Sequence, residues 1–223
     1  MAGSIVAAAS AASDTSSLTV TKPTGTANDD KMIAFQCSDW GTYAGLTAPA
    51  GWALLTGLDR GSNNLHLKIW TKTAASEGAN YVFPQGSGVD GCCSIVTLRG
   101  VDNTVANWLW ATPAWAANSS SRVAPTVSGA GSGAVLLCSS LVDMNNTAVT
   151  WTPPSGMSEQ VDVQSNQWIS QSVASLLAPA NPTGTKTFTT SSSTFIGSVG
   201  GIEWSVVIPA TPAVNQGRFF ALM

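Results

Sequence analysis

The sequence predicts an all-β protein, an antiparallel β-sandwich of jelly-roll type built from two weakly similar repeats. Short runs of apolar residues alternate with polar residues at a period of two, and clusters of Gly, Pro, Asn and Asp separate these runs. No helical periodicity extends beyond two turns. A Pro-x-Gly corner occurs twice, as Pro-Ala-Gly-Trp at 49–52 and as Pro-Ser-Gly-Met at 154–157. Together these features favour a sandwich over a helical or mixed fold.

The chain divides into an arm, a sandwich domain and a second arm. The predicted boundaries are 1–16 for the N-terminal arm, 17–208 for the sandwich, with repeats 17–102 and 123–208 joined by 103–122, and 209–223 for the C-terminal arm. Small polar residues fill the first arm, and Pro209 and Pro212 keep the last one extended. We expect both arms to dock on this subunit or on a neighbour.

The first repeat should contain strands at 18–21, 32–37, 65–72, 78–83 and 93–99. In the second of these, Ile33, Phe35 and Cys37 share one face, and Met32 and Ala34 share the other. Both faces are apolar, which predicts a central strand. The run 65–72 alternates more cleanly.

In that run, Leu65, Leu67 and Ile69 are expected to face the core. The residues between them are then expected to face outward: His66, Lys68, Trp70 and Lys72. His66 is thus predicted to be a solvated strand residue. No nucleophile or carboxylate close to it in the sequence supports a catalytic role.

The second repeat restarts the pattern, with strands expected at 134–138, 168–174, 184–189 and 202–208. In the last strand Ile202, Trp204, Val206 and Ile208 should face inward and Glu203 outward. The strand at 134–138, like that at 32–37, is apolar on both faces, which favours one shared core. Two small sandwiches, split near residue 112, are the alternative.

The chain carries nine Trp residues, which serve both cores and binding surfaces. The Pro-x-Gly corner is expected to drive Trp52 against a sheet as a plug rather than to present it as a ligand platform. Trp108, Trp110 and Trp115 lie in the join between the repeats. We expect them to cover the core, since large exposed apolar patches are uncommon on soluble proteins.

Charge and hydropathy exclude two classes of partner. Charged residues make up only 9% of the chain, the formal net charge is −3, and no basic run is present. Binding to the phosphate backbone of nucleic acids needs a Lys/Arg patch, so nucleic acid is not expected as a partner. No apolar run is long enough to span a bilayer, and no basic residue precedes the apolar start as in a secretory signal.

The cysteines and the single histidine predict no cofactor and no metal. Cys37, Cys92, Cys93 and Cys138 lack metal-ligand spacing, and His66 cannot complete a zinc set. On a strand the adjacent Cys92 and Cys93 point to opposite faces, so at most one of them should face the core. We expect buried, reduced thiols, with a Cys37–Cys138 disulfide left open.

The acidic residues do not predict an enzyme. Asp29, Asp30, Asp59, Asp90 and Asp102 flank turns, where Asp is a standard residue. Asp29 and Asp30 lack the spaced series of oxygen ligands that calcium requires. Neither a Gly-x-Ser-x-Gly elbow nor a phosphate-binding loop is present. The sequence therefore predicts a protein without catalytic activity.

Several motifs resemble a module of tailed-bacteriophage virion proteins, which are described as minor tail, fibre or head-surface proteins. They are Leu-Thr-Val-Thr-Lys-Pro-Thr-Gly-Thr (18–26), Asp-Asp-Lys-Met-Ile-Ala-Phe (29–35), Ala-Pro-Ala-Gly-Trp (48–52) and Leu-Arg-Gly-Val-Asp (98–102). The resemblance covers 18–102 and extends more weakly to 123–208. The second half has Met157 in place of the corner Trp and lacks the Arg-Gly-Val-Asp ending. The family carries no catalytic residues to transfer.

The resemblance implies a structural protein on the exterior of a virion, assembled in the host cytoplasm, as a capsid decoration or minor tail protein. Its partners would be major capsid or tail proteins and further copies of itself. We expect Phe219, Phe220 and Leu222 of the C-terminal arm to make assembly contacts by burying apolar surface.

The alternative function is a carbohydrate-binding module or adhesin that grips a glycan of the host surface. Jelly-roll sandwiches commonly bind sugars through loop aromatics. Trp40, Tyr43 and Trp115 are the candidate ligand contacts, because they lie on predicted loops.

Overall fold

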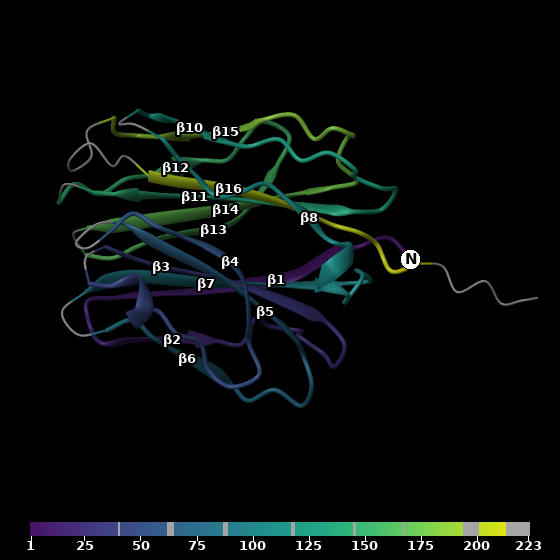
Figure 1. The fold of residues 1–223 in the computed structure, drawn as a ribbon, viewed down its shortest axis with the longest axis horizontal. Helices are drawn as coiled ribbons and strands as arrows, with labels where there is room; N and C mark the ends of the chain where they lie inside the picture. Colours follow the sequence, from purple (N-terminus) through teal and green to yellow (C-terminus); the bar gives the residue numbers. More distant parts are fainter. Residues whose placement is uncertain are drawn as a thin grey trace, which may run out of the picture.

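The computed structural model describes residues 1–39, 41–61, 65–86, 89–116, 119–144, 146–166, 168–193 and 201–212. It shows an all-β protein whose antiparallel sheets stack in layers (Figure 1). Two large sheets face each other in the middle, and a small sheet covers the outer face of each. The prediction of an all-β antiparallel fold is confirmed.

The first half of the chain forms one large and one small sheet. The large sheet has the order β1 (Ser4–Ser13), β7 (Asp90–Arg99), β3 (Lys31–Asp39), β5 (His66–Thr73) and β4 (Ala53–Asp59). The small sheet pairs β2 (Ser17–Thr21) with β6 (Asn80–Pro84). A short 3₁₀ helix, η1 (Tyr43–Gly45), lies in the long connection from β3 to β4.

The second half is built in the same way. Its large sheet has the order β13 (Ser158–Gln164), β14 (Ile169–Leu177), β11 (Val135–Asp143), β16 (Gly201–Ile208) and β8 (Leu109–Trp110), and β9 (Ala114–Ala116) also pairs with β16. Its small sheet has the order β10 (Ser121–Ala124), β15 (Lys186–Thr190) and β12 (Trp151–Thr152). A second 3₁₀ helix, η2 (Val105–Asn107), precedes β8.

Two segments that the sequence analysis placed outside the repeats are strands of the large sheets. The N-terminal segment is not an arm, because β1 pairs with β7 along most of its length. The join at 103–122 likewise supplies β8 and β9, which border β16 as β1 borders β7. Small residues such as the alanines of β1 suit this position, since they let an edge strand lie close to the neighbouring sheet.

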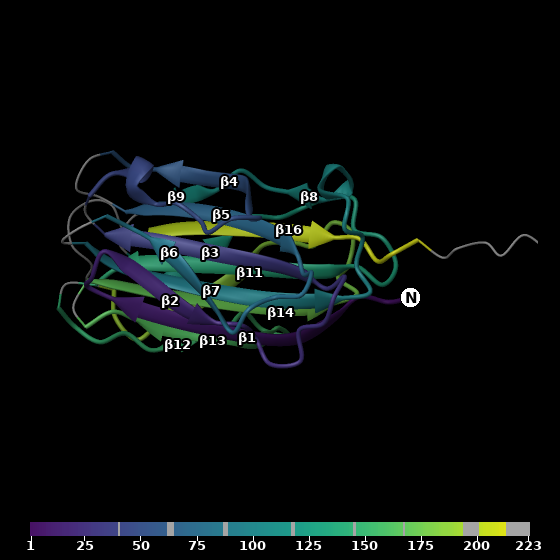
Figure 2. The ribbon, with the colours of Figure 1, turned by 90° about the horizontal axis from the view of Figure 1, so that it is seen from below.

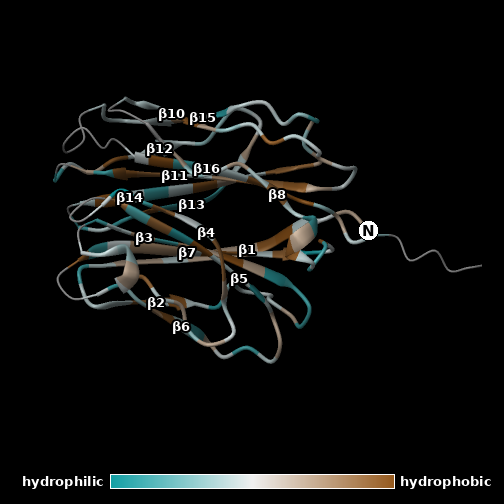
Figure 3. Cartoon of the chain, in the orientation of Figure 1, coloured by the Kyte–Doolittle hydropathy of each residue, from teal (hydrophilic) through white to brown (hydrophobic). Residues whose placement is uncertain are grey.

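The central core lies between the two large sheets and draws residues from both halves of the chain. Figure 3 shows apolar segments in the strands of both sheets. The ring of Phe35 on β3 meets the edge of Trp204 on β16, with centroids 5.9 Å apart. One polar side chain also crosses the gap: Gln171 accepts a hydrogen bond from Ser94 Oγ at 2.6 Å and donates to the carbonyl of Phe35 at 3.3 Å. Each polar atom of Gln171 thereby gains a partner inside the core.

The outer faces of the large sheets are also buried, which corrects the outward assignments made from the sequence. His66, Lys68 and Trp70 lie under the cover of the first half, and Glu203 lies under the small sheet of the second half. The alternation of side chains was assigned correctly, but the polar positions face a second, smaller core rather than solvent. Trp70 therefore needs a partner and donates its indole N–H to Gln36 Oε1 at 2.9 Å.

Aromatic side chains hold each small sheet on its large sheet. Trp52, at the Pro-x-Gly corner, packs edge-on against Tyr81 and Phe83 with centroid distances of 5.3 and 5.4 Å. This is the contact expected of a corner plug. The second half lacks a Trp at its corner, yet Trp151 of β12 makes the matching edge-on contact with Phe188 at 6.0 Å.

A buried ion pair ties β10 to the second large sheet. Arg122 and Glu203 are both almost completely buried, and the guanidinium meets the carboxylate through Nε at 2.8 Å and Nη2 at 2.5 Å. Burial raises the pKa of Glu203 to about 7, and the hydrogen bonds from Arg122 and Ser140 oppose that rise. Removing one partner would leave the other charge buried and unpaired, which costs several kcal/mol.

The tryptophans of the join have different environments. Trp108 is buried, donates its indole N–H to the carbonyl of Asp102 at 2.7 Å, and has the ammonium of Lys31 5.3 Å from its ring. Trp110 is 38% exposed, and the side chain of Trp115 lies outside the described part of the structure. The expectation that the tryptophans of the join cover the core is therefore confirmed for Trp108.

Replacing the central aromatic should unfold both halves together. We expect Phe35→Ala to lower the free energy of unfolding by about 3–5 kcal/mol, because the large cavity would lie in the core that the halves share. Unfolding in urea, followed by tryptophan fluorescence and by circular dichroism, measures this change.

The matched control is Val82→Ala, since Val82 is 49% exposed on β6 and should change stability by less than about 0.5 kcal/mol. Two separated unfolding transitions in the Phe35 variant, one of them unshifted, would contradict the shared core.

Candidate functional site

Of the three aromatic residues expected to contact a ligand, only Tyr43 has a described side chain. Trp40 lies outside the described residues. Trp115 lies in β9, where its backbone pairs with Ile202, but its side chain is not described. Among the three candidates, the described part of the structure therefore places only the side chain of Tyr43.

Tyr43 lies in η1, where the side chain of Thr42 caps the turn by accepting from the N–H of Gly45 at 3.3 Å. The ammonium nitrogen of Lys68 lies 4.3 Å from the centroid of the Tyr43 ring. The same ammonium donates a hydrogen bond to the carbonyl of Leu46 at 2.8 Å. One face of the ring is thus occupied by a cation from the protein itself. Its hydroxyl lies against Gly57, where a larger side chain would collide with it. Tyr43 serves here to hold the η1 loop on the sheet.

Beneath this loop the strand register aligns a serine, a histidine and an aspartate, which sequence reasoning missed. Ser38 on β3 is directly opposite His66 on β5, and His66 is directly opposite Asp59 on β4. Residues paired in this way have side chains on the same face of the sheet. His66 Nδ1 lies 3.0 Å from Asp59 Oδ1. These three residues could have been found only from the register of three paired strands, because no local sequence motif contains them.

The row has the residue types of a serine triad. In a triad the serine is accessible and the aspartate is buried, whereas here the serine is buried and the aspartate is exposed. Ser38 is fully buried, and its Oγ has no hydrogen-bond partner, whereas the Asp59 side chain is 51% exposed. A nucleophilic serine needs a hydrogen bond to its base and access to substrate. Burial lowers the pKa of His66, with Asp59 opposing that shift, so the imidazole is neutral near pH 7. These features suit a buried polar row better than a hydrolytic site.

The four cysteines are free and buried. Cys37 lies directly opposite Cys92 in the central core, while Cys138 belongs to the outer core of the second half. Cys92 and Cys93 point to opposite faces of the sheet, as expected, but both are buried, because Cys93 faces the outer core of the first half. Burial raises the pKa of Cys92 and of Cys93 well above the usual range, so neither is a ready nucleophile.

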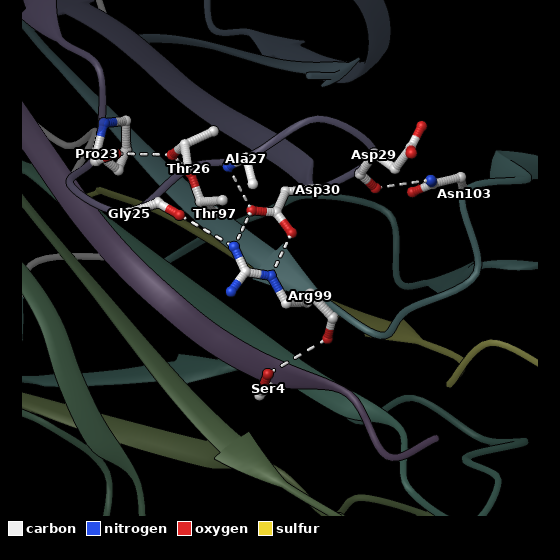
Figure 4. A network of polar contacts seen from close by, with 10 residues as sticks. All are labelled: Ser4, Pro23, Gly25, Thr26, Ala27, Asp29, Asp30, Thr97, Arg99 and Asn103. Atoms are coloured by element: carbon white, nitrogen blue, oxygen red, sulfur yellow. Dashed lines mark hydrogen bonds and ion pairs between the residues drawn. The ribbon is translucent and has the colours of Figure 1, made fainter. Parts of the chain in front are cut away.

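The motif residues that carry the family resemblance are structural. Asp30 and Arg99 come from two different motifs and form a two-pronged ion pair, with Nε–Oδ1 at 2.8 Å and Nη2–Oδ2 at 2.7 Å (Figure 4). Arg99 also donates to the carbonyl of Gly25, and Asp30 accepts from the N–H of Ala27. The pKa of Asp30 is lowered because these hydrogen bonds outweigh the effect of its burial. The pair locks the turn after β2 onto the end of β7.

The end of the sandwich at which the described chain begins and ends is hollowed. Gly133 lies against both Ala2 and Ala210, and the N–H of Gly3 donates to its carbonyl. A groove of about 380 Å³ lies beside them and reaches Pro212. A second, of about 420 Å³, lies between Ile5 and the end of β14, and a third, of about 310 Å³, is lined by β8 and residues 126–128.

The residues expected to make assembly contacts, Phe219, Phe220 and Leu222, lie outside the described residues. The described chain ends at Pro212, which lines the groove at the hollowed end. Within the ranges that the structure describes, no group of three or more His, Cys, Asp or Glu side chains could hold a metal ion. In those same ranges no helix is long and apolar enough to cross a membrane.

Comparison with known proteins finds no match among protein-family models, curated proteins or solved structures.

The Ser38 row should not react as a serine hydrolase. We expect a fluorophosphonate probe to leave the folded protein unmodified, because Ser38 Oγ is buried and has no hydrogen-bonded base. Intact-mass spectrometry of the treated protein measures the adduct. An adduct that disappears in both Ser38→Ala and His66→Gln would show that the row is catalytic.

Proposed function

We propose that this chain is a non-enzymatic structural protein of the exterior of a bacteriophage virion, either a capsid decoration or a minor tail protein. In this role it stabilises the particle, with contact to the host as a second role. The motifs at 18–26, 29–35, 48–52 and 98–102 suggest the family, and the strands and turns built from them are structural parts of the sandwich.

The observation that carries the proposal is that both described ends of the chain lie at one end of the sandwich. The N–H of Gly3 bonds to Gly133, and residue 210 forms a bridge with Val101 beside it. Figure 1 shows β16 running toward the end where the N-terminus is marked. A neighbour bound at this end would contact the described residues near both chain ends, and the opposite end of the sandwich would face away from it. Such polarity suits a subunit fixed to a particle by one end.

We also propose that each half is a copy of one jelly-roll module. In the first half β1, β7, β3 and β5 are neighbours in the large sheet, while β2 and β6 pair in the small one. In the second half β8, β16, β11 and β14 are neighbours, while β10 and β15 pair. The same alternation between two sheets, in the same order along the chain, supports a duplication. The edge strand β4 corresponds to β13, and each carries a register shift near its start.

The open sheet edges argue for attachment through side chains rather than through added strands. The edge strands β1, β4 and β13 all contain register shifts, at Ile5/Ala7, Leu54/Thr56 and Glu159/Val161. Figure 2 shows the remaining edge, where the short strands β8 and β9 lie on the same side as β4. Bulges and short strands discourage edge-to-edge pairing. Apolar side chains such as Phe219, Phe220 and Leu222 are therefore the proposed assembly contacts.

The number of copies per particle tests the proposal. We expect quantitative mass spectrometry of purified particles to find hundreds of copies of a capsid decoration protein, or a small multiple of three or six for a tail protein. Deletion of 213–223 should abolish incorporation while leaving the fold intact by circular dichroism, because it removes the proposed apolar contacts. Absence of the chain from particles would contradict the virion role, and normal incorporation of the deletion variant would contradict the role of the C-terminal segment.

A further inference from the structure

Two of the four free cysteines lie opposite each other on neighbouring strands. Cys37 on β3 is directly opposite Cys92 on β7. Directly opposite residues have their side chains on the same face of a sheet, and their Cα atoms are about 4.5–5.5 Å apart. A disulfide needs Cα atoms about 4.4–6.8 Å apart. The register of β3 and β7 therefore already supplies the separation that a disulfide requires.

The two sulfur atoms point into the central gap, where the side chains meet. The thiol of Cys37 donates to the carbonyl oxygen of Cys92 at 3.3 Å, and a hydrogen bond also links the two thiol groups. On the far side of the gap, Gln171 Nε2 donates to the sulfur of Cys37 at 3.4 Å. The sulfur of Cys92 lies 3.6 Å from the carbonyl oxygen of Ile169, which is also on β14. Both sulfurs thus lie between β14 and their own sheet.

The other two cysteines are not placed to compete for this partner. Cys37 and Cys92 belong to the central core, whereas Cys93 belongs to the outer core of the first half and Cys138 to that of the second. Cys93 follows Cys92 directly and so points to the opposite face of β7. The Cys37–Cys138 disulfide that the sequence left open would join side chains in different cores. Only Cys37 and Cys92 share a core and a register position.

We propose that Cys37 and Cys92 are a site of oxidation, at which a small-molecule disulfide converts the two thiols into a disulfide bond between β3 and β7. The bond joins residues that are 55 positions apart in the chain. It ties together two adjacent strands in the interior of the first large sheet, which has β1 beyond β7 and β5 beyond β3. Oxidation thereby restrains the sheet from which the first half is built.

The reaction is a thiol–disulfide exchange in two steps. The thiolate of one cysteine attacks the small disulfide, forms a mixed disulfide and releases one small thiolate. The thiolate of the other cysteine then attacks the protein sulfur of the mixed disulfide and releases the second small thiolate. The protein thiols give two protons to the solvent, and the released thiolates take up two. Two electrons pass from the protein sulfurs to the small disulfide, so atoms and charge balance.

The exchange takes place when β3 and β7 are apart. Both thiols are fully buried, and burial raises the pKa of Cys92 well above its usual range, so the closed sheet offers neither access nor thiolate. Local opening, or a chain that has not yet folded, exposes both sulfurs. Closure in the native register then brings the second sulfur to the mixed disulfide. Reducing compartments such as the cytosol keep the two thiols reduced, and oxidising surroundings favour the bond.

Refolding in a glutathione buffer tests the site. Protein unfolded in urea is refolded with a mixture of oxidised and reduced glutathione, and is then denatured and alkylated. We expect two of the four free thiols to escape alkylation, with the loss of two hydrogen atoms in the intact mass. A proteolytic digest should yield one pair of linked peptides, which contain Cys37 and Cys92.

The oxidised protein should also be more stable than the same protein after reduction. We expect the equilibrium constant for unfolding in urea to fall about a hundredfold to a thousandfold, because a closed loop of this length restricts the unfolded chain. Circular dichroism measures both transitions.

The matched variants are Cys92→Ala and Cys93→Ala. Each removes one fully buried thiol from β7, but the two thiols lie on opposite faces of the sheet. We expect Cys93→Ala to form the bond as the unaltered protein does, and Cys92→Ala to keep all its remaining thiols open to alkylation. If Cys92→Ala fails to fold, the linked peptides of the unaltered protein still identify the bonded pair.

Three results would overturn the proposal. The first is a refolded protein with four alkylated cysteines. The second is a bond to Cys93 or Cys138, or glutathione retained on the protein as a stable mixed disulfide. The third is an oxidised protein that unfolds at a lower urea concentration than the reduced one, since the bond would then distort the sheet. All three use purified protein, so they are independent of the role in virions.

Discussion

The fold depends on one constraint: the central strands β3 and β11 are apolar on both faces, and both faces must be buried. A single two-layer sandwich can bury only one face of each sheet. The protein meets the constraint by packing its two large sheets against each other and covering each outer face with a small sheet. The Phe35–Trp204 contact lies in the middle layer, and the contacts of Trp52 and Trp151 lie in the outer layers.

Burial of every face of the large sheets forces polar side chains into the interior, and each requires its own solution. Glu203 meets Arg122, Trp70 meets Gln36, and Gln171 bridges the two halves. Each of these pairings matters for stability, because an unpaired polar or charged group in an interior of low polarity has a large free-energy cost.

Polar contacts within the described structure also join segments that are distant in the chain. Arg99 and Asp30 bring two of the motif segments together through an ion pair, and Asp102 caps the turn that follows by accepting from the N–H of Thr104 and the side chain of Asn107. These contacts fix turns to strands.

The sequence alone determined the all-β class, the positions of the main strands and the alternation of their side chains, because a period of two and turn residues are local signals. Only the tertiary structure decided what lies over each face. His66 was assigned to the correct face but is buried, and residues 4–13 form a sheet strand, because the cover comes from segments distant in the chain. The alignment of Ser38, His66 and Asp59 likewise depends on strand register. No local pattern records it, since Ser38 lies 28 residues before His66 in the chain.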